Sequence, residues 1–428
     1  MRLTMFQSGK GDCLLLGDTG DETRILVDGG MPDAYSAHVA AGLSALRSKK
    51  KKDIDLVYVS HIDQDHIGGV LRMLDDEVLW RVHEHQIKNG NHKHKPPRAP
   101  RPPKIGGIWH NGFRDQLPKN AEPIEETLAA MAPVLSGAEL DSLREIGQAQ
   151  AALTSSVGEA IRVSRRIAPN QLNIPLNRQA KGKLFMRRRG QKPITLGRFT
   201  ITILAPSAKQ LEDLRVEWKE WLDKATSRKF LTKLRKQSRA DEKAIGAADF
   251  DHLFAMIRLQ AEAFGDPDSV TPPNLASLML LVEEGSQSIL LTGDGRWDHL
   301  VEGLKETGHL DDSGQPFNVD ILKVPHHGSR NNVVDTDLLD RVIASHYVFC
   351  GDGGHGNPAV DVVELMAKRR MKAAGKFKFW FNCSAAVAGR HEVAHMRALE
   401  RKVRALAKAS SGRMTFKFLD AGDSLRVI

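Results

Sequence analysis

Four potential metal ligands within six residues constrain the fold more than any other feature of the sequence. They are His61, Asp63, Asp65 and His66, in the run His61-Ile62-Asp63-Gln64-Asp65-His66. The run follows residues 56–60, whose apolar and β-branched character is typical of a buried strand, and precedes Gly68-Gly69, which should let the chain turn. Alternate residues of an extended segment point the same way, so His61, Asp63 and Asp65 are expected to converge, with His66 joining from the next step.

Imidazole and carboxylate groups together are typical ligands of zinc and manganese. Two of each are more ligands than one tetrahedral ion takes from a single loop. The run therefore predicts two adjacent divalent metal ions, Zn²⁺ in first place and Mn²⁺ as the alternative.

The composition indicates a globular protein without membrane segments. The chain has 428 residues, 41% of them hydrophobic and 27% charged, which is long enough for two domains or for one domain with large insertions. No segment has the length of a membrane span or the pattern of a secretory signal, so no membrane partner is expected. The three cysteines are far apart and odd in number, which favours a reducing compartment and predicts a cytoplasmic location.

The net charge of +9 predicts a polyanionic partner, either nucleic acid or another phosphate-rich substrate. The basic residues are clustered, although each cluster is also compatible with an ordinary solvated surface. The residues expected to bind phosphate are Arg187, Arg188, Arg189, Lys229, Lys233, Arg235 and Lys236. The oligomeric state stays open.

The chain alternates between strand-like and helical regions. We expect strands at 13–16, 25–27, 54–60, 199–204, 278–282, 288–292, 319–324, 347–349, 414–419 and 424–428, an extended proline-rich loop at 92–104, and helices at 360–372 and 394–408. This pattern divides the chain into a first half of the main domain at 1–120, a helical insertion at 121–170, a return to the sheet at 171–205, a basic helical insertion at 206–270 and a second half at 271–428.

The metal-ligand run resembles the His-x-His-x-Asp-His signature of the metallo-β-lactamase fold superfamily, with Asp63 in place of the second histidine. This variant is similar to the one in the hydrolase domain of bacterial competence DNA-uptake channel proteins and in choline-phosphate esterases of the same fold. Further matches follow in the expected order, at 9–14 (Gly-x-Gly-Asp), 25–30, 290–294 (ending Thr-Gly-Asp) and 322–329 (ending His-His-Gly-Ser). The resemblance implies an α/β fold, an αββα sandwich with helical insertions.

The resemblance also implies a set of metal ligands. One metal would be held by His61, Asp63 and a further histidine, and the other by Asp65, His66 and one of His326 and His327. Asp294 would bridge the two metals, and Asp28 would support the metal loop. The further histidine is expected to be His110, with His83, His85, His92 and His94 as competitors.

The segment 353–358 resembles the late Gly-His-Pro-His-Pro loop of the family, with Asn357 where the last histidine usually stands. Either His355 substitutes for that histidine, or Asn357 hydrogen-bonds the substrate, with Ser329 nearby. The expected catalytic residues are Asp65, Asp294, His327 and His355.

These residues predict a dinuclear metal hydrolase that uses a hydroxide bridging the metals, most plausibly a phosphodiesterase or nuclease. A small-molecule esterase or lactonase of the same fold is one alternative, and a non-catalytic metal-binding interaction protein is another. The sequence also contains His391-Glu392-Val393-Ala394-His395, which fits the zinc-protease pattern His-Glu-x-x-His. No third ligand follows at the usual protease spacing, so an exposed helix start is favoured.

Overall fold

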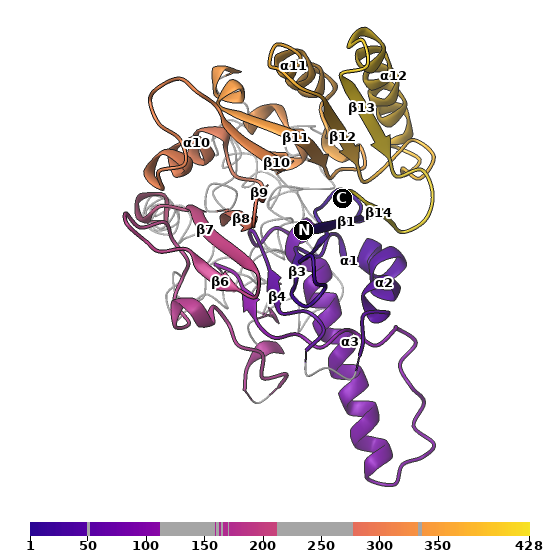
Figure 1. Cartoon of the computed structure of the whole chain (residues 1–428). Helices are drawn as coiled ribbons and strands as arrows, with labels where there is room; N and C mark the ends of the chain where they lie inside the picture. The colour runs from indigo at the N-terminus through magenta and orange to yellow at the C-terminus, as the bar shows by residue number, and fades with distance from the viewer. Residues whose placement is uncertain are drawn as a thin grey trace, which may run out of the picture.

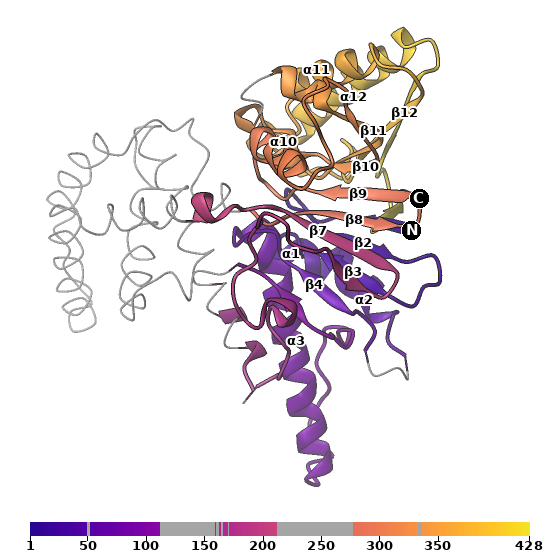
Figure 2. The ribbon, with the colours of Figure 1, turned by 60° about the vertical axis from the view of Figure 1, so that its left-hand side comes forward.

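The structure is a computed structural model that describes residues 1–48, 52–111, 159, 162–163, 166–169, 171–211, 277–332 and 336–428. The predicted helical insertions at 121–170 and 206–270 lie largely outside these residues. The described chain forms two β-sheets packed face to face, with helices on both outer sides (Figures 1 and 2).

The first sheet has six strands in the order β14-β1-β2-β3-β4-β5. Their bounds are β1 (Arg2–Phe6), β2 (Leu14–Gly17), β3 (Arg24–Val27), β4 (Leu56–Tyr58), β5 (Ile108–Trp109) and β14 (Ser424–Arg426). Strands β1, β2 and β3 pair antiparallel, whereas β3, β4 and β5 are parallel. The carboxyl ends of β3, β4 and β5 therefore lie at one edge of the sheet.

The second sheet has eight strands in the order β13-β12-β11-β10-β9-β8-β7-β6. Their bounds are β6 (Ile194–Leu196), β7 (Phe199–Ala205), β8 (Met279–Glu284), β9 (Gln287–Leu291), β10 (Phe317–Lys323), β11 (Val342–Phe349), β12 (Phe377–Phe381) and β13 (Met414–Phe418). The five strands from β9 to β13 are parallel. Their carboxyl ends share a second edge, which faces the edge described for the first sheet.

Alternating side chains from both sheets fill the space between them. Leu14, Leu16, Ile25 and Val27 from the first sheet belong to the same buried cluster as β7–β10 residues of the second, such as Ile289. Because successive strand residues point to opposite faces, the remaining apolar residues are directed outward to the helices. Two further buried clusters form there, one under each helical layer.

The helices complete an αββα sandwich, which confirms the predicted fold class. One outer face is covered by α1 (Pro32–Ala34), the π-helical turn η1 (Tyr35–Val39), α2 (Ala40–Ser44) and α3 (Gln64–Lys88), and the other by α10 (Trp297–Glu306), α11 (Val360–Arg370) and α12 (Val393–Ala409). Short 3₁₀ turns are η3 (Arg178–Ala180), η4 (Pro325–Gly328), η5 (Arg330–Asn332), η6 (Thr336–Arg341) and η7 (Gly354–Gly356). None of the helices in the described ranges has both the length and the apolar character that crossing a membrane requires.

Helix α3 contradicts the turn predicted at Gly68-Gly69. The helix starts at Gln64, runs for 25 residues and continues as an arm that projects from the body (Figures 1 and 2). The two glycines serve close packing instead, since a Cβ on Gly69 would stand 2.0 Å from the carbonyl oxygen of Gly29. Helix α3 thus lies directly against the turn that follows β3, and this contact fixes the position of the metal-ligand run.

Candidate metal centre

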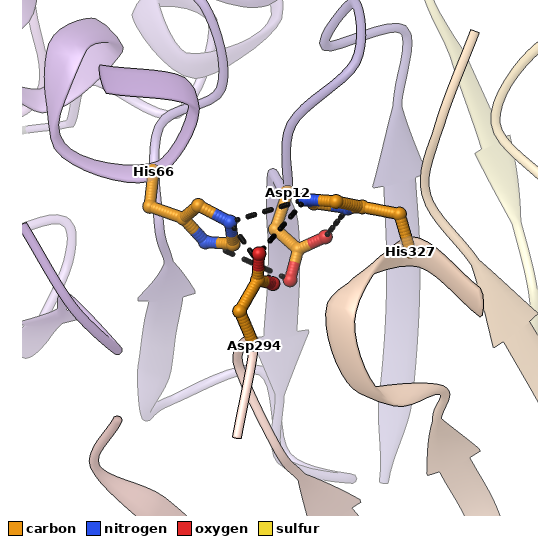
Figure 3. A group of neighbouring side chains, drawn as sticks. All are labelled: Asp12, His66, Asp294 and His327. Atoms are coloured by element: carbon orange, nitrogen blue, oxygen red, sulfur yellow. Dashed lines mark hydrogen bonds and ion pairs between the residues drawn. The ribbon is translucent and has the colours of Figure 1, made fainter. Parts of the chain in front are cut away.

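The predicted ligands meet where the two sheet edges face each other. Asp28 follows β3, and the run from His61 to His66 follows β4 and enters the first turn of α3. Asp294 follows β9, and the pair His326-His327 lies in η4 after β10. Carboxyl ends of parallel strands are the usual place for a site in an α/β sheet. Figure 3 shows His66, Asp294 and His327 around one point, with Asp12 beside them.

Four side chains form a compact first group: Asp65, His66, Asp294 and His327. The His66 Nε2 lies 3.2 Å from Asp294 Oδ1 and 3.4 Å from His327 Nε2. The His327 Nε2 lies 3.4 Å from Asp65 Oδ2 and 3.3 Å from Asp294 Oδ2. Ligand atoms 2.0 to 2.2 Å from a tetrahedral zinc ion are about 3.3 to 3.6 Å apart. The measured separations are therefore those expected between ligands of a metal ion.

A second group shares Asp294 and includes His61, Asp63 and His326. The His61 Nε2 lies 3.6 Å from Asp63 Oδ2 and 3.9 Å from Asp294 Oδ2. The His326 Nε2 lies 3.6 Å from the same Asp294 oxygen. Within the described residues, His61 Nε2 and Asp294 Oδ1 are buried without a hydrogen-bond partner. Such atoms are costly unless something binds them, and a metal ion would.

Asp28 holds the metal loop in place. Its carboxylate accepts hydrogen bonds from the Ser60 backbone N–H at 2.7 Å and from the Ser60 hydroxyl at 2.8 Å. It also lies 2.9 Å from His66 Nδ1. A carboxylate on Nδ1 fixes the tautomer and directs the lone pair of Nε2 towards the centre of the group.

Asp12 and Lys323 are part of the site although neither was predicted to be. Asp12 Oδ1 lies 3.3 Å from His327 Nδ1, and its other oxygen makes an ion pair with Lys323, with both side chains 1% exposed. Lys323 also donates to the carbonyl of Gly293 at 3.0 Å and lies 3.7 Å from Asp294. Asp12 can coordinate a metal with His66, Asp294 and His327 by distance alone. Asp12 faces the Nδ1 atoms of His66 and His327, whereas the Nε2 atoms of these histidines point into the first group. Its position is therefore that of a carboxylate that orients the two imidazoles.

Asn332 orients the remaining histidine. Its side-chain oxygen accepts a hydrogen bond from His326 Nδ1 at 2.5 Å, and its amide donates to the carbonyls of Asp294 and Gly295 at 2.8 Å each. His326 and His327 both have left-handed backbone conformations, with φ of 46° and 54°. This unusual backbone brings two consecutive imidazoles to the same aspartate.

The charges of the site shift its pKa values. Burial acts to lower the pKa of His66, but Asp294 and Asp28 outweigh it and raise that pKa well above its usual value. Burial also acts to lower the pKa of His327, but Asp294 and Asp12 outweigh it and raise that pKa well above its usual value. Burial acts to raise the pKa of Asp294, but His327 and His66 hold it well below the usual value. The site therefore favours positive charge.

Counting formal charges gives the same result. The site contains five carboxylates and one buried ammonium group, namely Asp12, Asp28, Asp63, Asp65, Asp294 and Lys323. Four negative charges remain, which is the charge that two divalent cations would balance. The residues thus fit divalent metal ions in the nature of their ligand atoms, their spacing and their charge.

Comparison with known proteins agrees with this geometry. Residues 8–130 match the model of a family described as the metallo-beta-lactamase superfamily. This part of the chain, which includes the metal-ligand run, is thus similar to the metallo-β-lactamase superfamily. Among solved structures, a crystal structure of Zn²⁺-bound PqqB from Methylobacterium extorquens is similar over 100% of both chains, with 9% identity and a TM-score of 0.35. No curated protein matches the chain.

His110, predicted as the further histidine, follows β5, the strand that pairs with β4. It is buried at the end of β5, where its backbone N–H and carbonyl bond to the Asn177 side chain. Burial lowers the pKa of His110 to about 4. Among the described residues both of its ring nitrogens are buried without a hydrogen-bond partner, and its role as a metal ligand stays a prediction.

The competing histidines are farther away. His83 and His85 lie in the distal part of α3, about 25 Å along the helix from His66 at 1.5 Å per residue. His94 returns beside the arm, where its Nδ1 lies 3.0 Å from that of His83. His92 is exposed on the same loop. This arm is separate from the candidate metal centre.

The zinc-protease pattern does not form a site. Helix α12 begins at Val393, so His391 and Glu392 precede it and the two histidines do not share a helix face. His395 Nε2 instead lies 2.9 Å from the carbonyl oxygen of Pro358.

The late loop, residues 353–358, lies at the rim of the candidate metal centre. The His355 residue is exposed overall. Partial burial of its ring and the nearby charge of Lys10 lower its pKa, and the opposing effect of the Asp65 carboxylate is smaller. Asn357 contributes backbone hydrogen bonds to Gly353 and Gly354. Ser329 is buried behind His326, to whose carbonyl its backbone N–H donates.

The predicted phosphate-binding arginines differ in exposure. Arg187 is only 4% exposed and is held by Glu302 at 3.2 Å, Glu306 at 2.8 Å and the carbonyl of Leu204. It is therefore a structural residue that does not reach solvent, contrary to expectation. Arg188 and Arg189 are exposed. The remaining predicted residues, Lys229, Lys233, Arg235 and Lys236, lie outside the described residues.

Proposed function

We propose that this chain is a hydrolase that binds two divalent metal ions and cleaves phosphodiester bonds. The first ion would be held by Asp65, His66, Asp294 and His327, and the second by His61, Asp63, Asp294 and His326. Zn²⁺ is the preferred metal, with Mn²⁺ as the alternative. The supporting observation is the cluster of buried and partly buried carboxylates and imidazoles, in which nitrogen and oxygen atoms lie 3.2 to 3.9 Å apart.

This assignment gives both histidines of the His-His-Gly-Ser motif a role. His326 and His327 each approach Asp294 with Nε2, at 3.6 Å and 3.3 Å. The further histidine that the family pattern requires is therefore His326, and His110 is left out. Asp294 has two carboxylate oxygens close to different groups, which suits it to bridge both ions.

Two bound divalent ions would supply an activated water and would neutralise charge on the phosphate oxygens. The protein's own residues prepare the site for this chemistry. Asp28, Asp12 and Asn332 keep the Nε2 atoms of three histidines directed inward, and Lys323 offsets part of the negative charge. His355 at the rim is placed to contact the leaving group. The net charge of +9 favours a polyanionic substrate over a neutral lactone or ester.

The test combines metal analysis with hydrolysis of bis(p-nitrophenyl) phosphate. The parent should contain two metal equivalents, and His61→Ala and Asp294→Ala should each lose at least about 100-fold in rate. His326→Ala should retain about one equivalent. His110→Leu is the matched control and should retain two, because it removes a buried imidazole outside the cluster.

Three results would contradict the proposal. Two equivalents in His326→Ala but one in His110→Leu would reverse the ligand assignment. A parent that binds metal and cleaves only lactones or phosphocholine esters would support the esterase alternative. A parent that holds metal and cleaves none of these substrates would support a binding protein.

A further inference from the structure

A cleft of about 530 Å³ lies between α12 and β13, outside the metal centre. Arg397 and Arg404 line its helical side, and Lys417 and Phe416 line its strand side. The guanidinium of Arg404 lies 5.6 Å from the centre of the Phe416 ring. The cleft thus combines three cations with a half-buried aromatic ring.

Helix α12 carries a basic stripe along this cleft. Arg397, Arg401, Arg404 and Lys408 are all exposed, and their spacing of four, three and four residues places them on one face of the helix. The opposite face, which includes Leu399 and Val403, is buried. At 1.5 Å per residue the stripe is about 16 Å long, which equals the rise of four or five phosphates of one nucleic-acid strand.

The acidic residues of the cleft are already engaged. Glu400 accepts a hydrogen bond from the Ala385 backbone N–H at 2.7 Å and lies 3.8 Å from Arg404. Asp420 lies 3.6 Å from Lys417. The Glu400 side chain is 20% exposed and that of Arg404 is 65% exposed, whereas Lys417 and Asp420 are 48% and 58% exposed, so the arginines are the cations that a ligand would meet.

The stripe starts at the rim of the metal centre. The first turn of α12 packs on the loop that carries His355, since His395 Nε2 lies 2.9 Å from the Pro358 carbonyl and a Cβ on Gly353 would stand 3.0 Å from Glu392. Strand β13 is three positions from β10 in the same parallel sheet, which is about 14 Å at normal strand spacing. A polymer in the cleft could therefore continue into the metal centre.

We propose that the cleft between α12 and β13 binds the backbone of a single-stranded nucleic acid whose adjacent segment is cleaved at the metal centre. The inference rests on the proposed phosphodiesterase function. A positively charged groove beside an aromatic ring is the usual composition of single-strand binding sites, because phosphates contact the cations and bases stack on the ring.

The experiment measures binding without turnover. Fluorescence anisotropy would follow a labelled 12-nucleotide oligo(dT) and a 12-base-pair duplex, with the full chain in EDTA, over a series of salt concentrations. The double variant Arg397→Gln/Arg404→Gln should bind oligo(dT) at least about tenfold more weakly, and its salt dependence should fall by about 1.4 in slope, since each phosphate contact contributes about 0.7 for a single strand. The control Lys372→Gln/Lys376→Gln removes the same charge from exposed residues at the other end of β12 and should bind as the parent does.

Binding by the Arg397→Gln/Arg404→Gln variant at parental strength, or equal weakening in the control, would overturn the inference. Tighter binding of the duplex by the parent would overturn the preference for a single strand. A parent that cleaves bis(p-nitrophenyl) phosphate but does not bind oligo(dT) would refute this inference alone. A parent that binds oligo(dT) through the arginines but cleaves no phosphodiester would refute the proposed function alone.

Discussion

Replacing Gly11 with alanine should disable the first metal group through the backbone, without touching any ligand. A Cβ on Gly11 would stand 1.7 Å from the carbonyl oxygen of Asp65, whereas real Cβ contacts are essentially never below 3.0 Å. The turn before β2 and the first turn of α3 would have to separate by at least 1.3 Å. Both partners are backbone, so no change of rotamer can relieve the overlap.

Such a separation is large for a metal site. Ligand distances must hold to about 0.2 Å, and a displacement of about 1 Å near a reacting group can cost about 100-fold in rate. Gly11→Ala should therefore lose the metal held with Asp65 and His66, and its hydrolysis of bis(p-nitrophenyl) phosphate should fall by at least about 100-fold. Metal analysis and initial rates measure both effects.

The matched control is Gly17→Ala in the same hairpin. Its Cβ would meet nothing closer than the Asp21 carboxylate at 3.8 Å, and its backbone φ is not positive. A compatible Gly→Ala change usually stabilises a protein by about 0.4 to 1 kcal/mol through the unfolded state. Gly17→Ala should retain two metal equivalents and the parental rate. If Gly11→Ala did the same, the close contact between the turn and the metal loop would be refuted.

Three further changes test the surroundings of the site. Asp28→Asn should weaken metal binding about 10- to 100-fold in a chelator competition, because it removes the charge that orients the metal loop, and unchanged affinity would exclude that role. Lys323→Met should destabilise the protein by about 3 to 5 kcal/mol in urea unfolding, because it leaves Asp12 buried without its cation, whereas the pair Asp12→Asn/Lys323→Met should recover much of that loss. Burial acts to raise the pKa of Asp53, but hydrogen bonds from Lys104 and Ser48 outweigh it and lower that pKa. Ionised Asp53 therefore stabilises the fold above the pKa of the unfolded chain, and this stabilisation is lost as the pH falls through the lower pKa of the folded protein. Asp53→Asn should flatten the fall of the unfolding free energy in acid, and an unchanged slope would contradict this role.

The strands of the sandwich could be predicted from local sequence because each is a short apolar run that ends in small or polar residues. Most predicted strand positions agree with the structure to within a few residues, as at β7 (Phe199–Ala205) and β9 (Gln287–Leu291). Helix α3 could not be predicted, because Gly68 and Gly69 are weak helix formers. The structure requires glycine at both positions, because a larger residue at Gly68 would collide with Pro32 and one at Gly69 would collide with the Gly29 carbonyl.

The ligands within the metal-ligand run could be predicted from their spacing, whereas their partners depend on tertiary structure. Asp12 occurs in a recognised Gly-x-Gly-Asp turn, yet only its ion pair with Lys323 and its contact with His327 give it a place in the site. Lys323 itself stands in an apolar strand, and a buried lysine at a strand end is a signal that could have identified it. The approach of His326 to Asp294 could not be read from the sequence, because it depends on the left-handed backbone of His326.

The division of the ligands between the two sheets has a consequence for stability. In the proposed second group His61 and Asp63 come from the six-stranded sheet, whereas Asp294 and His326 come from the eight-stranded sheet. Neither proposed site takes all four of its ligands from one sheet, so tight metal binding requires both sheets to be packed together and must in turn stabilise that packing. Free metal at 1,000 times its dissociation constant would add about 4 kcal/mol to the free energy of unfolding for each site. The thermal midpoint should therefore rise with free Zn²⁺ in the parent and rise less in His326→Ala, and a midpoint independent of metal in both proteins would mean that the cluster binds no cation across the sheets.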